Sequence, residues 1–509
     1  MTLMSPADGS SPGPPPPQEA EARSGSAPPD GAERSRALWV WPALATVAFS
    51  LIGVNGTQLG TDELVTWDVS RRGARQILDL VHHVDAVHGT YYLLMHGWTA
   101  VFGDSHTALR MPTVLAAGAT AALVTLIGRR LFGRRAALCA GLLFALIPAT
   151  SRFAQEARSY ALVMMLATLA TLLLLRALDT PRRRRPWAAY GLCLAILGLV
   201  HLIALTVVLG HAVAVVLRTR HERRGLGHFV LAVLAAGACV LPVVVFGRSQ
   251  ASRQLFWLPE PGAWGLVEIW PQLFASGLCT GVVVALAALA WRERGGHLPV
   301  LLCGAVAVLP PLVLWLASHG EVSYFRYQYA LFTVPAWAVL AGAGLAAATR
   351  SRSAPAVVLS VVALLVLPDQ RSVRRPFEHD VPHAADYAGA ARTIEKYYRS
   401  GDAVVYVRGA PWMLDQGVRY YLRPDVHPRE VFLAATAAQN DDLFPVYCPR
   451  PARCLAGESR IWVVVPGNNL DVLSAVPPPQ AQALRAAKYT VYGTESLSGL
   501  TVGLLVRRP

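Results

Sequence analysis

Polar side chains gather at the ends of the hydrophobic segments of this chain, where they could exchange protons or bind anions. Three loops carry them: Asp62, Glu63, Asp85 and His88 in the first, Gln155, Glu156, Arg158 and Tyr160 in the second, and Arg326 and Tyr327 in the third. The topology argued below places all three loops on the same side of a membrane. A site built from them would face water on one side and lipid on the other.

The residues of these loops also have a structural interpretation. Thr61 is a good helix N-cap, and acidic residues such as Asp62 and Glu63 in a first helical turn gain about 0.3–1 kcal/mol from the helix dipole. Arg158 can mark the outer end of a span, and Tyr160 can belong to an aromatic belt at the membrane surface. Residue type and spacing alone therefore leave both interpretations open.

The hydrophobic segments place the chain among integral membrane proteins. Of its 509 residues, 54% are hydrophobic and 15% are charged, whereas an average soluble domain has roughly 25% charged residues. A helix needs roughly 20 apolar residues to cross the hydrocarbon core, and runs near that length recur between Leu38 and Leu367. We predict about eleven spans, at 37–53, 108–127, 135–150, 158–176, 187–200, 202–217, 228–246, 271–290, 298–317, 329–348 and 354–367.

Arginines set the predicted orientation, because short cytoplasmic loops carry an excess of Lys and Arg. The arginine-rich loops all fall on one side, at 129–135, 182–185, 218–224, 292–294 and 350–352. The net charge of +14 therefore does not indicate nucleic-acid binding. Both ends of 187–217 face the cytoplasm, so this stretch is predicted to form two short helices that turn near His201. The N-terminus is then cytoplasmic, and the C-terminal domain lies outside.

Three regions follow from this topology. Residues 1–36, rich in Pro, Gly, Ser and Ala, are predicted to form a disordered cytoplasmic tail. Residues 37–368 form a transmembrane domain, and residues 369–509 form an extracytoplasmic α/β domain. The first outer loop, 54–107, is far longer than a usual connection, and its apolar patterns predict short helices that lie in the membrane interface.

The outer domain has its own sequence pattern. We predict a helix over 384–398 and strands over 403–407, 461–465 and 501–506. Cys448 and Cys454 flank the loop Pro-Arg-Pro-Ala-Arg. Because that compartment is oxidising, we predict a disulfide between them.

A series of short motifs connects the acidic pair to the later spans. The motifs are Asp85-Ala-Val-His88-Gly-Thr-Tyr91-Tyr92, Phe102-Gly-Asp104-Ser105, Ala108-Leu-Arg110-Met-Pro112, Gly128-Arg-Arg-Leu-Phe-Gly133, Gln155-Glu-Ala-Arg158-Ser-Tyr160, Leu-Val-His201 and Phe325-Arg326-Tyr327. Their order resembles the polyprenyl-phosphate-sugar-dependent glycosyltransferases of the GT-C superfamily, in particular bacterial members of the protein O-mannosyltransferase and lipid A aminoarabinose transferase group. The resemblance covers roughly residues 38–367. Members often have His-Pro-Pro where this chain has His88-Gly89-Thr90.

The resemblance implies a GT-C-like fold and a specific reaction. A single sugar, with mannose favoured, would pass from a polyprenyl-phosphate carrier to an acceptor hydroxyl outside the cytoplasm. In this family the first-loop acid lies at the active site, which here implies Asp62 with Glu63 beside it. Asp62 would take the proton of the acceptor and stabilise positive charge on the sugar ring. Glu63 would orient the acceptor or a metal, and direct displacement would invert the anomeric centre.

The leaving phosphate in such a reaction needs positive charge. Arg158 and Arg326, with Tyr160 and Tyr327, are the expected phosphate site, because a guanidinium can form paired hydrogen bonds with a phosphate. A divalent metal could serve instead, with Asp62 and Glu63 as ligands. The other site candidates are Asp85, His88, Gln155, Glu156 and His201. The expected partners are a lipid-linked sugar donor and a protein, glycolipid or polysaccharide acceptor at a bacterial plasma membrane.

Two other function classes stay open. A transporter or flippase of lipid-linked sugars would need a polar path, but no Asp, Glu, Lys or Arg lies near the middle of a predicted span. The polarity of the spans is limited to His201, His211 and scattered Ser and Thr. A non-catalytic scaffold would have no need of charged residues from three loops at one membrane face. We therefore favour the enzyme.

Overall fold

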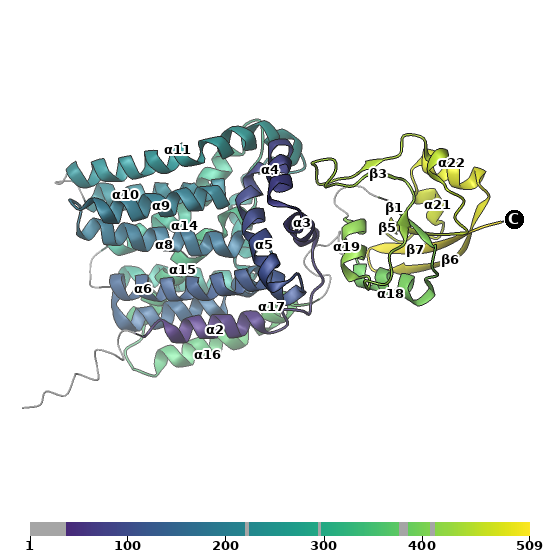
Figure 1. Ribbon diagram of the computed structural model, residues 1–509. Helices are drawn as coiled ribbons and strands as arrows, with labels where there is room; N and C mark the ends of the chain where they lie inside the picture. The colour runs from purple at the N-terminus through teal and green to yellow at the C-terminus, as the bar shows by residue number, and fades with distance from the viewer. Residues whose placement is uncertain (1–36, 219–222, 294–296, 376–384, 408–412, 509) are drawn as a thin grey trace, which may run out of the picture. The chain divides into compact units, whose positions relative to one another are not determined.

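The computed structural model describes residues 37–218, 223–293, 297–375, 385–407 and 413–508 (Figure 1). The predicted tail over 1–36 lies outside the described residues. The described chain is mostly helical up to Ser372, and it then forms a domain with a β-sheet. This is the helical membrane protein with a C-terminal α/β domain that the sequence predicts.

Helices cover all of the predicted spans, but the span predicted over 271–290 is broken, because α12 and α13 meet there at a bend of 99°. The helices are α2 (Val40–Leu51), α6 (His106–Leu146), α8 (Tyr160–Asp179), α9 (Arg184–Val200), α10 (Val207–Arg218), α11 (Arg223–Gln254), α12 (Gly265–Phe274), α13 (Gly277–Leu289), α14 (Leu298–Ala317), α15 (Val334–Ala348) and α16 (Ala354–Leu365). Among the described residues, 5 helices are long and apolar enough to cross a membrane, and up to 6 if the bent pair α12–α13 is one span. The number of crossings therefore stays a prediction.

Helix α6 contains two of the predicted spans, which a turn at Gly133 separates. Gly133 has a φ of +87°, which glycine adopts without steric cost. A straight helix would hold residues 128 and 137 roughly 13 Å apart, yet a Cβ atom added to Gly128 would lie 3.1 Å from the Cα of Ala137. The segments before and after Gly133 therefore fold back on one another, as the separate spans 108–127 and 135–150 require.

The break predicted near His201 is also present. Helix α9 ends at Val200, His201 has an extended backbone, and the 3₁₀ helix η2 (Leu202–Thr206) leads into α10. The backbone of His201 therefore interrupts the helical hydrogen bonding at the position that the flanking arginines required.

Short helices occupy the long first loop and run across one end of the bundle (Figure 1). They are α3 (Thr61–Ser70), α4 (Ala74–His83), η1 (Ala86–His88) and α5 (Gly89–Phe102). Leu64 of α3 and Tyr91, Tyr92 and Met95 of α5 are all buried. The predicted helices of this loop are therefore confirmed, whereas their depth in a membrane stays a prediction.

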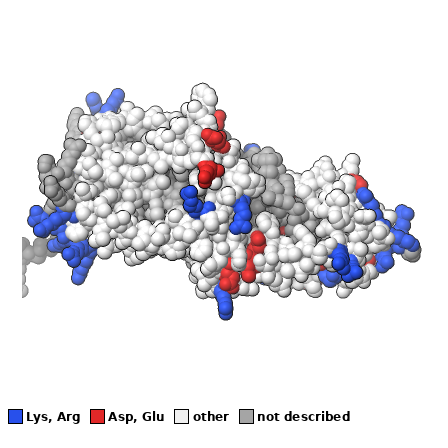
Figure 2. Space-filling view, turned by 90° about the horizontal axis from the view of Figure 1, so that it is seen from above, with Lys and Arg blue, Asp and Glu red and all other residues white. Residues whose placement is uncertain are grey.

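The bundle surface suits a bilayer. Helix α11 exposes Leu231, Leu234, Leu241 and Val245, each by more than half of its surface. On the face shown in Figure 2, Lys and Arg side chains gather at one end of the bundle, next to a broad surface without charged side chains. Apolar surface between charged ends is typical of a membrane-spanning protein, and the chain is a multi-pass membrane protein.

The C-terminal domain is built on a five-stranded sheet in the order β2-β1-β5-β7-β6. The strands are β1 (Ala403–Tyr406), β2 (Arg429–Glu430), β5 (Arg460–Pro466), β6 (Tyr489–Leu497) and β7 (Leu500–Arg507). Strand β1 pairs in parallel with β2 and β5, whereas β7 is antiparallel to β5 and β6. Helices α18 (Tyr387–Tyr397), α19 (Leu414–Tyr421) and α22 (Pro478–Ala486) belong to the same domain.

Candidate active site

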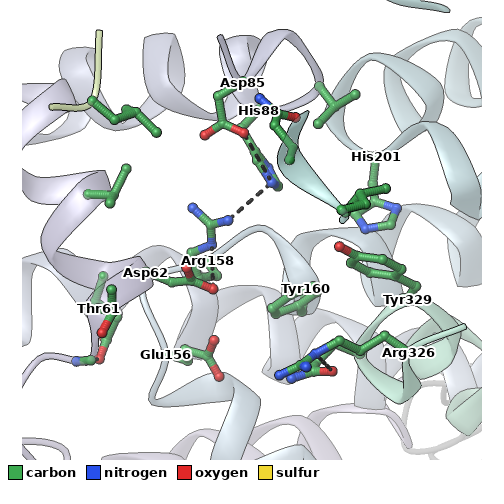
Figure 3. Close-up of a pocket in the computed structure, with 18 of the residues that line it drawn as sticks. Thr61, Asp62, Asp85, His88, Glu156, Arg158, Tyr160, His201, Arg326 and Tyr329 are labelled. Atoms are coloured by element: carbon green, nitrogen blue, oxygen red, sulfur yellow. Dashed lines mark hydrogen bonds and ion pairs between the residues drawn. The ribbon is translucent and has the colours of Figure 1, made fainter. Parts of the chain in front are cut away.

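A cavity of about 1430 Å³ brings the three polar loops together (Figure 3). Ten of the sequence candidates line it: Asp62, Glu63, Asp85, His88, Gln155, Glu156, Arg158, Tyr160, His201 and Arg326. Helix α3 and η1 with the residue before it supply four of them. The others come from the segment between α7 (Pro148–Ala154) and α8, from the first residue of α8, and from the residues just before η2 and η4 (Tyr327–Thr333). Residues up to 264 positions apart in sequence, Asp62 and Arg326, thus share one cavity.

Asp62 presents its carboxylate to this cavity from the first turn of α3. Its side chain is 60% exposed, and its Oδ2 lies 3.8 Å from the Nε of Arg158. The N-cap of α3 is Gly60 rather than Thr61, which is the first helical residue. The capping role expected for Thr61 is therefore wrong, because the helix begins one residue earlier than its sequence suggests.

Glu63 has a different environment from its neighbour Asp62. Its Oε1 accepts hydrogen bonds from Arg110 Nε (2.9 Å) and from the backbone N–H of Ala157 (2.8 Å). Its Oε2 accepts from an Arg110 terminal nitrogen (2.8 Å) and from the N–H of Gly60 (3.0 Å). Burial favours a higher pKa for Glu63, but the charge of Arg110 and these hydrogen bonds leave the pKa lowered. Glu63 is therefore a buried anion whose oxygens the protein itself occupies.

Arg110 organises the loop that leads to Asp62. Its side chain is only 1% exposed, and besides Glu63 it donates hydrogen bonds to the carbonyl oxygens of Val54 (2.6 Å), Thr57 (3.2 Å) and Gln58 (3.2 Å). Sequence reasoning did not identify Arg110 as a site residue, although it belongs to the Ala-Leu-Arg-Met-Pro motif. The available signal was an arginine at the start of a predicted apolar span. Through Arg110, Glu63 holds this loop in place, and its expected role in orienting the acceptor stays a prediction.

Arg158 is buried between Asp62 and His88 in the segment that precedes α8. One terminal nitrogen donates a hydrogen bond to His88 Nε2 at 3.1 Å, while its Nε faces Asp62 (Figure 3). Only 7% of its side chain is exposed. The loops of Asp62, His88 and Arg158 therefore meet as the resemblance implies.

Asp85 and His88 form the opposite wall of the cavity. Asp85 accepts a hydrogen bond from the hydroxyl of Tyr92, and its Oδ1 lies 3.9 Å from His88 Nε2. Burial raises the pKa of Asp85, although the charge of Arg158 and the hydrogen bond from Tyr92 oppose it. Burial and the charge of Arg158 lower the pKa of His88 to about 3. His88 is therefore neutral at physiological pH.

Three ring side chains, those of Tyr160, His201 and Tyr329, line the cavity near Arg158 (Figure 3). The ring of His201 lies 6.2 Å from that of Tyr160 and 5.4 Å from that of Tyr329, measured between centroids. Arg326 lies close by, donates from Nε to the Gln328 side-chain oxygen at 2.8 Å, and stacks over the Trp257 ring at 4.8 Å. Arg326 therefore lines the cavity without an acidic partner among the described residues.

Tyr327 does not line the cavity. Its ring packs against Phe153 and Arg152, at 6.3 Å and 5.8 Å, and Tyr329 lines the cavity in its place. In the 3₁₀ helix η4, residues two positions apart point in different directions. Which tyrosine of this segment reaches the cavity depends on the rotation of η4, which its packing sets.

Gln155 and Glu156 have separate roles. The side-chain nitrogen of Gln155 donates to the carbonyl oxygens of Ser50 (2.8 Å) and Ile52 (2.7 Å), so Gln155 ties this loop to the end of α2. Glu156 lines the cavity below Arg158 in the view of Figure 3. Of this pair, Glu156 is the one placed to meet a substrate.

Comparison with known proteins agrees with this arrangement. Residues 90–246 match the family model described as dolichyl-phosphate-mannose-protein mannosyltransferase. ArnT from Cupriavidus metallidurans, in the apo state, has a similar structure with a TM-score of 0.61 and 17% sequence identity, over 93% of this chain and 98% of that one. ArnT bound to undecaprenyl phosphate gives a TM-score of 0.60 and 15% identity, over the same shares of the two chains. No curated protein matches the chain in sequence.

The family match covers about a third of the chain, and the ArnT structures show that the chain shares their fold. The family match includes Arg110, Arg158 and His201, whereas Asp62 and His88 lie before it. The polar cavity therefore joins matched and unmatched parts of the chain.

The donor set around Asp62 does not fit a divalent metal. Among the described residues, no group of three or more His, Cys, Asp and Glu side chains could hold one. Glu63 is occupied by Arg110, and the cation beside Asp62 is the guanidinium of Arg158. A metal ion prefers several anionic or neutral ligands and is repelled by a fixed cation. The cation available beside Asp62 is therefore the guanidinium of Arg158.

Cys448 and Cys454 lie far along the chain from this site, in the C-terminal domain. Their sulfur atoms are bonded, and their Cα atoms lie 6.6 Å apart. This separation is within the range that disulfides allow. Formation of the disulfide in solution stays a prediction.

Proposed function

We propose that this protein is a GT-C glycosyltransferase that moves a single sugar from a polyprenyl-phosphate carrier to an acceptor hydroxyl outside the cytoplasm. The observation that carries the proposal is the exposed Asp62 carboxylate beside the buried Arg158 guanidinium in one large cavity. The Asp62 carboxylate is suited to take the proton of an acceptor hydroxyl, and the Arg158 guanidinium is suited to bind a phosphate. The ArnT structure with bound undecaprenyl phosphate supports a carrier of the polyprenyl-phosphate class.

The reaction is a direct displacement at the anomeric carbon. The acceptor oxygen bonds to that carbon as the bond from the carbon to the phosphate oxygen breaks, and the electron pair of the broken bond leaves with the polyprenyl phosphate. Asp62 accepts the proton of the acceptor hydroxyl and also stabilises positive charge on the ring. Attack from the face opposite the phosphate inverts the anomeric configuration. No strong general acid is needed, because a phosphate is a good leaving group.

Asp62 fits the role of base better than the other acidic residues of the cavity. Glu63 is buried and its two oxygens already accept four hydrogen bonds. Asp85 accepts a hydrogen bond from Tyr92 and lies close to His88. Asp62, by contrast, meets the cavity with most of its side chain exposed. We therefore assign the proton transfer to Asp62.

Arginines of the cavity hold the phosphate in this proposal. Arg158 is fixed close to Asp62, so a phosphate beside it would place the sugar near the base. Arg326, without an acidic partner among the described residues, supplies a second cation on the same cavity. Guanidinium groups suit this task because they form paired hydrogen bonds with phosphate oxygens.

Mannose is the sugar that we propose, since the matching family model describes transfer from dolichyl-phosphate-mannose. The acceptor is a protein, a glycolipid or a polysaccharide. We place the protein in a bacterial plasma membrane, with the N-terminus in the cytoplasm and the cavity and the C-terminal domain outside, because the arginine-rich loops share one side.

Release of polyprenyl phosphate tests this function. Purified protein in detergent is incubated with polyprenyl-phosphate mannose and a panel of acceptors, and the lipid products are separated. We expect polyprenyl phosphate to appear in proportion to the sugar transferred. Movement of intact donor across vesicles without cleavage would contradict the proposal and support the flippase. Cleavage with another sugar alone would replace mannose but keep the reaction.

A further inference from the structure

His88 contacts Arg158 through its ring nitrogen Nε2, and the geometry decides whether that nitrogen carries a proton. The distance from the Arg158 terminal nitrogen to His88 Nε2 is 3.1 Å. A guanidinium has only donors, so His88 Nε2 must accept and the ring proton must reside on Nδ1. Asp85 lies 3.9 Å from the same Nε2, which is too far for a hydrogen bond. His88 is thus an acceptor aimed at the arginine.

This orientation of the His88 ring has a cost at the other ring nitrogen, Nδ1. His88 Nδ1 is buried and has no hydrogen-bond partner among the described residues. Buried donors without a partner are rare in proteins, and a retained one calls for an explanation. The contact with Arg158 supplies it, because rotating the ring to satisfy Nδ1 would remove the acceptor from the guanidinium.

The turn that carries His88 is held from two directions. Asp85 has a left-handed backbone with a φ of 61°, a conformation that few residues besides glycine, asparagine and aspartate adopt. From α11, the buried Gln250 accepts a hydrogen bond from the N–H of Ala86 (2.9 Å) and donates one to the carbonyl of Val81 (3.1 Å). Gln250 therefore fixes the residues before and within this turn.

We infer that His88 is a positioning residue that holds the Arg158 guanidinium for the donor phosphate, and that Gln250 holds His88 in place. The inference rests on the proposed function, because Arg158 is assigned there to the phosphate. Besides His88, Arg158 meets Asp62 as an ion pair at 3.8 Å and forms a side-chain hydrogen bond with Tyr92. With His88 on one nitrogen and Asp62 facing another, the plane of the guanidinium is set.

The charged and titratable groups that face His88 act in both directions: burial and Arg158 lower the pKa of His88, whereas Asp62 raises it by less. These groups are Asp85, Tyr92, Asp62, Arg158 and His201. A protonated His88 would direct an N–H at the donor nitrogen of Arg158 and would push the guanidinium away. Holding Arg158 therefore requires a hydrogen-bond acceptor at the position of Nε2. It does not require a histidine that changes its protonation state.

Three variants of the full-length protein test this role, with undecaprenyl phosphate as the binding probe. His88→Gln places an amide oxygen near the position of Nε2, so affinity and turnover should stay within about threefold of wild type. His88→Leu removes the acceptor, and the affinity should fall on the order of 10-fold because the guanidinium loses its hydrogen bond. His82→Gln, on the exposed end of α4, is the matched control and should change neither.

Gln250→Met, alone and combined with His88→Leu, provides a second test. It distinguishes an effect that passes through His88 from a general loss of packing. If Gln250 acts through His88, this change weakens binding in the wild type but adds nothing in the His88→Leu background. Additive losses, or an affinity of His88→Leu equal to that of wild type at an unchanged melting temperature, would overturn the inference. Failure of the proposed function looks different, because the wild-type protein would then neither bind undecaprenyl phosphate nor release it from donor.

Discussion

Asp62 and Arg158 form an unequal ion pair, in which the anion is 60% exposed and the cation 7% exposed, with Oδ2 and Nε 3.8 Å apart. This distance is too long for a hydrogen bond, so the oxygens of Asp62 keep their lone pairs for a substrate. The buried guanidinium of Arg158 is held by His88 at 3.1 Å. The pair thus combines an exposed carboxylate with a buried cation.

Asp62→Asn separates a catalytic role from a helix-capping role. Asparagine is tolerated at a helix start nearly as well as aspartate, but it cannot take a proton. We expect single-turnover transfer to slow by on the order of 10²–10⁴ while donor binding survives. Asp79→Asn, in exposed α4, is the control and should transfer normally. Near-normal transfer by Asp62→Asn with a lowered melting temperature would assign Asp62 to structure.

Arg158→Lys tests the phosphate site. Lysine keeps the charge but loses the planar pair of donors, so we expect affinity for undecaprenyl phosphate to fall on the order of 10-fold. Binding is measured by titration in detergent, with Arg75→Lys on exposed α4 as the control. An unchanged affinity in Arg158→Ala would exclude Arg158 from the site and leave Arg326 as the next candidate.

Glu63→Gln should act mainly on stability. Removing one partner of a buried ion pair leaves Arg110 uncompensated, at a cost of about 3–5 kcal/mol. In the folded protein the charge of Arg110 and the hydrogen bonds hold the pKa of Glu63 below the usual 4.5, so its contribution to stability is present above pH 4.5 and is lost as the pH falls through the folded pKa. Thermal unfolding at several pH values should show this acid-dependent loss in the wild type only. Equal pH dependence in both proteins would contradict the assignment.

The orientation in the membrane can be tested with an impermeant thiol reagent. In intact cells, a cysteine placed in the N-terminal tail of the protein should not react with the reagent, because the arginine-rich loops assign that side to the cytoplasm. A cysteine at Tyr492, which is 79% exposed in the C-terminal domain, should react. The opposite labelling would move the cavity to the cytoplasm.

Cys448 and Cys454 should be oxidised in the mature protein, since the C-terminal domain is assigned to an oxidising compartment. Mass spectrometry of non-reduced peptides should recover the two cysteines as one linked species. Recovery of two free thiols would count against the disulfide and also against the outside position of this domain.

The sequence by itself determined the class of the protein and the segments that form its site. Hydrophobic length and arginine position located the helices, because desolvation in a bilayer acts on each segment separately. The break at His201 and the division of α6 at Gly133 follow from the same local rules. The apolar pattern of the first loop also predicted its short helices.

Only the tertiary structure decided what adjacent residues do. Asp62 and Glu63 are neighbours in sequence and both line the cavity, yet the side chain of Asp62 is 60% exposed whereas Glu63 is buried against Arg110, 47 positions away. Tyr329 replaces Tyr327 at the cavity because the rotation of η4 depends on packing. The tautomer of His88 depends on Arg158, 70 positions away. Burial and hydrogen-bond partners are properties of the assembled loops, so no local pattern can specify them.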